Sequence, residues 1–161
     1  MENFIFWQQA LRVAGPAIPA NAEARLRDML AIRQFSMKDR LAGFVHPDHI
    51  RVWKTTTVGI AGDVVEFKGE VRPGPEGTVI EGMLRYKTHS KIQFIGLLAM
   101  SVGLLLVGAF QKFSGTQPAG DLLGIGGAVT FITLFWIYAS SQMRHTQIEF
   151  IEAKLNEAVA A

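Results

Sequence analysis

Two long stretches without a charged residue constrain this chain more than any other feature. Residues 92–111 and 122–143 contain no Asp, Glu, Lys or Arg. A helix of about 20 apolar residues is about 30 Å long, which matches the hydrocarbon core of a bilayer. The sequence therefore predicts a transmembrane hairpin over residues 91–143, with spans at about 92–110 and 122–142. The alternative, two buried core helices, needs more surrounding structure than a chain of 161 residues offers.

Basic residues predict how this hairpin is oriented. Arg85, Lys87 and Lys91 precede the first stretch, and Arg144 follows the second, whereas the loop between them carries only Lys112 as a basic residue. Because basic residues are enriched in short cytoplasmic loops, both termini are predicted to be cytoplasmic. Four residues suit the inner membrane interface by charge or aromatic character: Lys91, Trp136, Tyr138 and Arg144.

Small residues recur at a spacing of four in both stretches. They are Ala99 and Gly103 in the first, and Gly120, Gly124 and Ala128 in or beside the second. Small side chains at this spacing let helices approach closely in lipid. Two interpretations stay open: these residues pack the hairpin against itself, or the second set faces another protein.

The spans carry no Asp, Glu, Lys, Arg or His, which argues against a transport role. Transporters, proton relays and voltage sensors place such groups inside the membrane. The chain also has no cysteine, which excludes thiolate catalysis and thiolate metal sites. Its net charge of +2 gives no reason to expect a nucleic-acid partner. These features favour a membrane anchor over a pathway for ions.

Residues 1–90 have an ordinary soluble pattern and are predicted to form a cytoplasmic domain. Residues 22–40 show the spacing of an amphipathic helix, with Asn21 as its N-cap. Residues 63–72 and 78–87 alternate apolar and polar side chains around a Pro-Gly turn, which is typical of a β-hairpin. The predicted fold class is α+β: a small antiparallel β-meander of three or four strands with an amphipathic helix, followed by a transmembrane α-helical hairpin and a C-terminal amphipathic helix.

The C-terminal tail, residues 144–161, is predicted to continue the second span into the cytoplasm as a helix. Apolar residues follow one side of this helix at helical spacing: Ile148, Ile151, Leu155 and Val159. This stripe either docks on the domain of its own chain or contacts another subunit.

A search for chemistry finds one weak metal cluster, His46, Asp48 and His49. Imidazole and carboxylate are metal ligands, but Pro47 disfavours the helix that would place both histidines on one face. No phosphate-binding loop and no nucleophile beside a base is recognisable. The sequence therefore predicts no catalytic residue, no cofactor and no metal.

The chain also resembles a group of proteins. The runs Phe67-Lys68-Gly69-Glu70-Val71 and Gly77-Thr78-Val79-Ile80-Glu81-Gly82, followed by two spans and a short tail, are similar to small bacterial inner-membrane proteins. Those proteins place a soluble helix-plus-strand domain ahead of a transmembrane hairpin. The resemblance covers roughly residues 20–161 and implies a bacterial inner membrane and a regulatory or accessory role. The group has no established activity to transfer.

The expected function is a non-catalytic, membrane-anchored accessory or interaction subunit of a larger inner-membrane assembly. Its expected partners are membrane lipids and other membrane subunits or a second copy, and not nucleic acid. The aromatic run Phe4–Trp7 is either an interfacial segment or a subunit contact. Two alternatives remain: a membrane-proximal sensor of a small ligand or lipid, and a membrane-bound enzyme that uses His46, Asp48 and His49.

Overall fold

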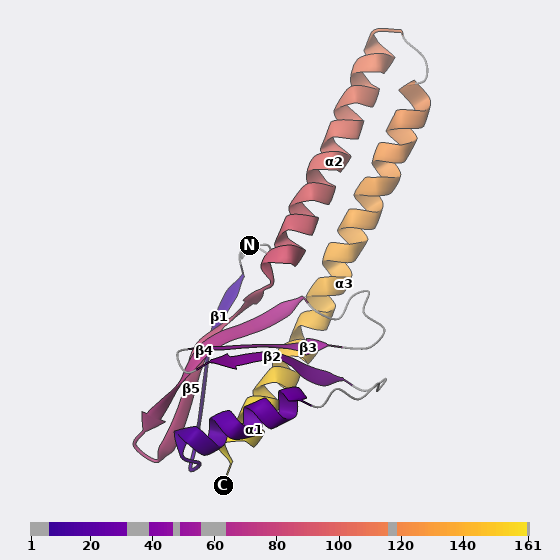
Figure 1. Cartoon of the computed structure of the whole chain (residues 1–161). Coiled ribbons are helices and arrows are strands. Elements are labelled where there is room, and N and C mark those ends of the chain that lie inside the picture. Colours follow the sequence, from indigo (N-terminus) through magenta and orange to yellow (C-terminus); the bar gives the residue numbers. More distant parts are fainter. Residues whose placement is uncertain (1–6, 32–38, 47–48, 56–63, 116–118, 161) are drawn as a thin grey trace. The chain divides into compact units, whose positions relative to one another are not determined.

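The computed structural model describes residues 7–31, 39–46, 49–55, 64–115 and 119–160, and it has the predicted α+β class (Figure 1). The elements, in chain order, are β1 (Gln8–Gly15), α1 (Pro19–Ala31), β2 (Arg40–His46), β3 (His49–Thr55), β4 (Val65–Gly74), β5 (Gly77–Tyr86), α2 (Thr88–Phe113) and α3 (Ala119–Val159). The strands form one antiparallel sheet in the order β1-β5-β4-β3-β2.

The chain divides into two compact units. The first, which we call the sheet domain, comprises residues 1–87 and 143–161, and the second, the helical hairpin, comprises residues 88–142. The hairpin is therefore an insertion between the last strand of the sheet domain and its last helical segment. The tail, predicted as a segment of its own, belongs to the sheet domain.

One face of the sheet carries the core of the sheet domain. Side chains of β4 and β5 such as Phe67, Ile80 and Leu84 are fully buried. They are covered by α1, which buries Leu26, and by the last turns of α3, which bury Leu155. Removing such side chains from water is the main favourable term in folding, so the tail is an integral part of this domain.

The partner-contact candidates on the tail are placed by this packing. Ile151, Leu155 and Val159 are at most 2% exposed, and Ile148 is half-buried. Most of the stripe is thus packed inside its own domain, which was one of the two interpretations. Two hydrogen bonds to backbone carbonyls reinforce this docking: the Ala17 N–H donates to the Val159 carbonyl at 3.1 Å, and the Arg25 guanidinium donates to the Ala160 carbonyl.

The fifth strand, β1, was not predicted. It pairs with β5, so that Gln8 lies opposite Arg85 and Gly15 opposite Thr78. Trp7, which precedes it, is 7% exposed and packs edge-on against Tyr86 with ring centroids 5.7 Å apart. Trp7 is therefore a core residue, while residues 4–6 of the aromatic run lie outside the described residues. Only a pairing partner about 70 positions away turns this short segment into a strand.

The first helix begins and ends earlier than predicted. Pro19 opens α1, and Asn21 and Ala22 donate their N–H groups to the Ile18 carbonyl, so Asn21 lies inside the first turn and is not the N-cap. Proline suits the first helical position because it has no N–H to satisfy there. The predicted helix included Arg40, which instead begins β2; residues 32–38 lie outside the described residues.

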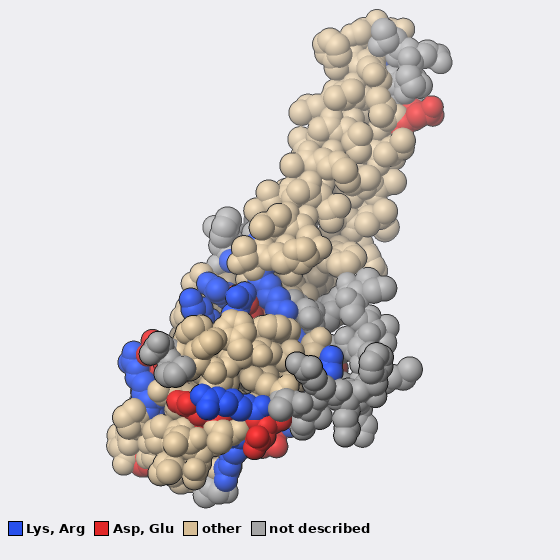
Figure 2. All heavy atoms as spheres, in the orientation of Figure 1, with Lys and Arg blue, Asp and Glu red and all other residues tan. Residues whose placement is uncertain are grey.

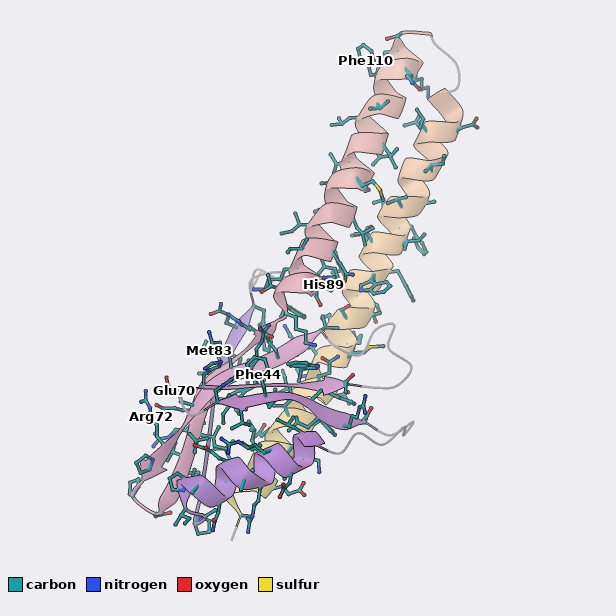
Figure 3. All side chains as sticks on the ribbon, viewed as in Figure 1. Phe44, Glu70, Arg72, Met83, His89 and Phe110 are labelled. Atoms are coloured by element: carbon teal, nitrogen blue, oxygen red, sulfur yellow. The ribbon has the colours of Figure 1, made fainter. Side chains whose placement is uncertain are left out.

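Both helices of the hairpin are long and apolar enough to cross a membrane. Segments of 18 residues within α2 and α3 have mean hydropathies of 2.2 and 1.9. Figure 2 shows Lys, Arg, Asp and Glu gathered on the sheet domain, whereas the surface of the two helices is almost free of them. His89 and Phe110 mark opposite ends of α2 (Figure 3).

The two helices of the hairpin contact each other through residues other than those predicted. A Cβ added to Gly126 would lie 3.1 Å from Leu105, and one added to Gly108 would lie 3.0 Å from Leu123. The hydroxyl groups of Ser101 and Thr130 form a hydrogen bond between the helices. These positions let the helices approach closely.

The predicted packing residues lie elsewhere on the hairpin. Ala99, Gly103, Gly124 and Ala128 are exposed, and a Cβ at Gly103 or Gly124 would meet nothing within 4 Å. The expectation that they pack the hairpin against itself is corrected, because the spacing of small residues does not state which side of a helix meets its neighbour. For Gly120 the structure describes the helical backbone only.

Candidate functional site

The second face of the sheet is open, because α1 and the tail both lie on the other one. Its side chains form rows across the strands. One row is Phe44, Arg51, Lys68, Met83 and Ala10, since each of these residues pairs with the next. A neighbouring row is Ala42, Trp53, Glu66, Arg85 and Gln8. We call this surface the open face.

A fully buried carboxylate holds the middle of the open face. Glu66 is 0% exposed, and its two oxygens accept from Arg51 at 2.7 Å and from Arg85 at 2.9 Å. Two guanidinium groups thus share one carboxylate, with charge-assisted hydrogen bonds that fix both arginines. Beside them, Lys87 Nζ lies 4.1 Å from the centre of the Trp53 ring.

A second network occupies the β4–β5 hairpin. Arg72 contacts Glu70 at 2.8 Å and Glu81 at 2.6 Å, and all three side chains are about half exposed. Figure 3 labels Glu70 and Arg72 beside each other on the sheet. The two carboxylates raise the pKa of the Arg72 guanidinium, with Glu70 as the larger cause. Arg72 therefore balances the acidic side chains at this end of the face.

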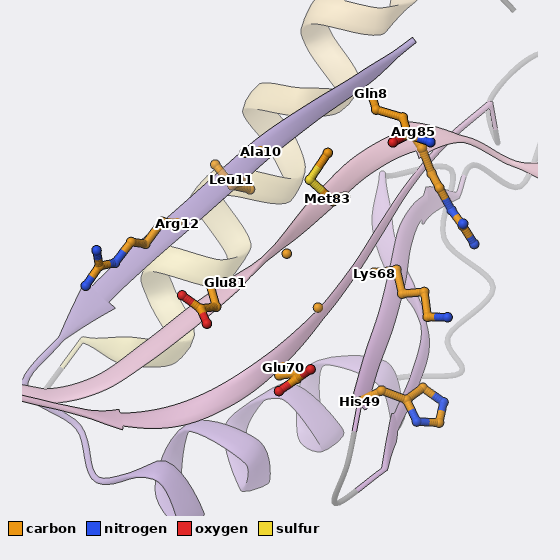
Figure 4. A pocket seen from close by; sticks show the side chains of 12 residues that line it. Gln8, Ala10, Leu11, Arg12, His49, Lys68, Glu70, Glu81, Met83 and Arg85 are labelled. Atoms are coloured by element: carbon orange, nitrogen blue, oxygen red, sulfur yellow. The ribbon is translucent and has the colours of Figure 1, made fainter. Parts of the chain in front are cut away.

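Between the two networks lies a groove of about 680 Å³. This volume is within the range of small-molecule sites. Its lining side chains come from four strands, as Figure 4 shows, and include Gln8, Ala10, Arg12, His49, Lys68, Glu70, Glu81, Met83 and Arg85. Met83 is 39% exposed; it lies across the strands from Ala10 on one side and from Lys68 on the other.

The predicted histidine cluster lies at one end of the open face. His46 and His49 face each other across β2 and β3, with stacked rings 5.0 Å apart, and Phe44 contacts both rings edge-on. A strand pairing thus brings the two histidines together without the helix that Pro47 disfavours. Within the described part of the chain no group of three or more His, Asp or Glu could hold a metal. Asp48 lies outside the described residues.

A third cluster joins the start of the sheet domain to its last helical segment. The Arg144 guanidinium lies 4.9 Å from the centre of the Trp7 ring and interacts with the Tyr86 hydroxyl. Burial raises the pKa of Tyr86, and the charge of Arg144 partly offsets this rise. Arg144 was predicted as a membrane-interface residue; the structure gives its guanidinium partners inside the sheet domain.

The other interface candidates lie in the hairpin. Lys91 is in the first turns of α2, and Trp136 and Tyr138 lie on α3, where Tyr138 is 62% exposed. Sequence reasoning missed the groove altogether. The alternation of charged residues in 63–72 and 78–87 was visible, but which residues of β1 and β3 complete the lining depends on strand order.

Comparison with known proteins adds little to this geometry. No protein-family model matches the chain, and no curated protein matches it. Among solved structures, the chain is similar to the Polyketide_cyc-like protein Cgl2372 from Corynebacterium glutamicum, known from a solution NMR structure. The identity is 12%, the alignment covers 83% of this chain and 96% of that one, and the TM-score is 0.28. A likeness at this level carries no argument about fold or activity.

Proposed function

We propose that this protein is a non-catalytic binding module that is anchored in a membrane and takes a ligand on the open face of its sheet domain. One observation carries the proposal. The sheet domain uses α1 and the tail to cover one face of its sheet, and the face left open contains a groove with fixed polar side chains and an apolar floor. Ligand sites commonly combine these features.

The arrangement of the lining favours binding over catalysis. Glu70 and Glu81 are about half exposed and held by Arg72, and Glu66 is held by two arginines. A general base needs a carboxylate that can reach a proton of the substrate, whereas these carboxylates serve as anchors for guanidinium groups. An enzyme built on His46 and His49 is the weaker alternative, because each ring stacks on the other.

The hairpin is proposed to be the anchor, in a bacterial inner membrane with both termini in the cytoplasm. The distribution of basic residues supports this orientation. The natural absence of cysteine gives a clean test. With Ser114→Cys and, separately, Ala160→Cys, a membrane-impermeant thiol reagent applied to intact cells should label position 114 only. Labelling of position 160 alone would overturn the orientation.

A second candidate is the accessory subunit suggested by sequence, with another membrane protein docked on the open face. Phe44 and Met83 are 37% and 39% exposed on this face, and apolar side chains of this kind are common in protein interfaces. The two candidates differ in what co-purifies with the protein when it is extracted: a small molecule for the first candidate, and another subunit for the second.

One substitution with a matched control tests the proposal. Ala10→Trp places a large side chain in the groove, whereas Ala14→Trp places it on the same exposed strand face but outside the lining. Wild-type protein extracted in native nanodiscs should carry a bound small molecule in native mass spectrometry. Ala10→Trp should remove it and Ala14→Trp should retain it. Retention in both variants, or a wild type without any bound molecule, would overturn the proposal. Loss of a bound subunit in Ala10→Trp would favour the second candidate.

A further inference from the structure

The strands around the groove carry two more basic than acidic side chains on the open face. On β1, β3, β4 and β5, the open face carries five basic and three acidic side chains: Arg12, Arg51, Lys68, Arg72 and Arg85 against Glu66, Glu70 and Glu81. All three carboxylates are already held by arginines. Within the described part of the chain, Arg12 and Lys68 form no ion pair. Both line the groove.

These two cations lie on either side of an apolar floor. Figure 4 shows Met83 in the groove, with Arg12 toward one end and Lys68 on the side away from β1. Lys68 pairs across the strands with Met83, and Met83 pairs with Ala10. A ligand in the groove therefore meets an exposed thioether and a methyl group between two positive charges.

We infer that the groove binds a phosphate monoester that carries a short apolar group. This inference rests on the function proposed above and names its ligand class. The anionic oxygens of the ligand satisfy Arg12 or Lys68, because hydrogen bonds from these side chains to an ionised acceptor such as phosphate are about twice as strong as neutral ones. The apolar group covers Met83 and Ala10. The same chemistry is offered by a soluble phosphate ester and by the headgroup region of a phosphatidic acid.

The fixed networks support this assignment. Arg51 and Arg85 cannot turn freely toward a ligand, since both are held by the buried Glu66. Because the three carboxylates of this face are bonded to other arginines, a ligand does not compete with them for Arg12 and Lys68. A cationic ligand would find Glu70 and Glu81 already bonded to Arg72.

The test uses the full chain in nanodiscs of neutral phosphatidylcholine and measures binding by isothermal titration calorimetry. The probes are hexyl phosphate, inorganic phosphate and hexanol. Hexyl phosphate should bind more tightly than inorganic phosphate, and hexanol should not bind measurably. Equal binding of hexanol and hexyl phosphate would overturn the inference.

Two sets of variants locate the site. Arg12→Gln with Lys68→Gln should weaken hexyl phosphate binding by about tenfold or more. Arg27→Gln with Lys154→Gln removes the same charge from helical surfaces outside the groove, and binding should not change. Met83→Ser should weaken binding of hexyl phosphate and leave inorganic phosphate unaffected. An equal loss in the groove pair and the control pair would show a non-specific charge effect and overturn the inference.

A soluble short-chain lipid distinguishes whether the ligand is a soluble phosphate ester or a phosphatidic acid. Dihexanoyl phosphatidic acid that binds more tightly than hexyl phosphate indicates a lipid, whereas weaker binding indicates a soluble ester; both support the shared chemistry. Failure of this inference is separable from failure of the proposed function. If hexyl phosphate does not bind but Ala10→Trp still removes the native small molecule, the ligand class is wrong and the proposed binding face stands.

Discussion

The backbone N–H of Val65 donates a hydrogen bond of 2.9 Å to Oε1 of Gln147, 82 positions further along the chain. Val65 begins β4, and Gln147 lies on the part of α3 that follows the hairpin. Both groups are buried. The chain thus leaves the sheet domain after β5, forms two long helices, and returns to complete the same core. The core of the sheet domain is therefore completed by a segment that follows the hairpin in the sequence.

Gln147→Leu should destabilise the sheet domain without affecting the hairpin. The substitution leaves the Val65 N–H buried without an acceptor, which costs about 1–3 kcal/mol. Hydrogen exchange of the full chain in nanodiscs, followed by mass spectrometry, should show faster exchange in β4. Glu149→Gln, at an exposed position of the same helix, is the control, and equal effects of the two variants would contradict the role of this bond.

Leu155→Ala tests whether the tail is a core element. Leu155 is 0% exposed, and truncation of a buried leucine costs about 2–5 kcal/mol. We expect a lower melting temperature of the sheet domain and faster exchange in β4 and β5. Asn156→Ala at the adjacent exposed position should have little effect. An unchanged melting temperature for Leu155→Ala would indicate that the stripe serves a partner instead.

Glu66→Gln should be the most damaging charge removal on the open face. It leaves Arg51 and Arg85 beside each other without their shared carboxylate. Because both arginines are about one-third exposed, we expect a loss of about 1.5–3 kcal/mol, the range of a hydrogen bond to a charged group. Glu70→Gln removes an exposed partner of Arg72, which is worth about 1 kcal/mol or less. Thermal unfolding of the two variants should therefore differ clearly, and a similar loss in both would show that the burial of Glu66 is of no consequence.

Tyr86 should make the sheet domain sensitive to alkali. The fold raises the pKa of Tyr86 by burial, so the unfolded chain ionises first, at a pH of about 10. The stabilising contribution is present below this pH and is lost as the pH rises through the folded pKa. The chain has two tyrosines, so in Tyr138→Phe the phenolate absorbance reports Tyr86 alone. Its midpoint should lie above 10, and a midpoint below 10 would contradict the structure.

Two glycines two positions apart should differ in their tolerance of a side chain. Gly126 faces Leu105, whereas Gly124 faces open space. In a Ser101→Cys, Thr130→Cys background, oxidation should form a disulfide between the helices. Adding Gly126→Ile should reduce its yield several-fold by separating the helices, and adding Gly124→Ile should not. Equal yields would place the contact on another side of the helices.

Local patterns in the sequence were sufficient for the elements whose physical cause is local. The absence of charge over 92–111 and 122–143 predicted two long apolar helices, since helical hydrogen bonds form within each segment. Alternation in 63–72 and 78–87 predicted the central hairpin, because a strand shows its faces with a period of two. The apolar spacing of the tail predicted its helix for the same kind of reason.

Features that depend on distant segments were decided only by the tertiary structure. Strand β1 exists because it pairs with β5, and the tail stripe is core because the sheet lies against it. Gly108 and Gly126 were indistinguishable in sequence from the small residues that face outward. The groove joins Arg12, Lys68 and Met83 from three strands, and a strand pattern states which face a side chain takes but not which strand lies next to it. The uncharged stretches determined from sequence alone where two helices form; the order of the strands determined what the rest of the chain presents for binding.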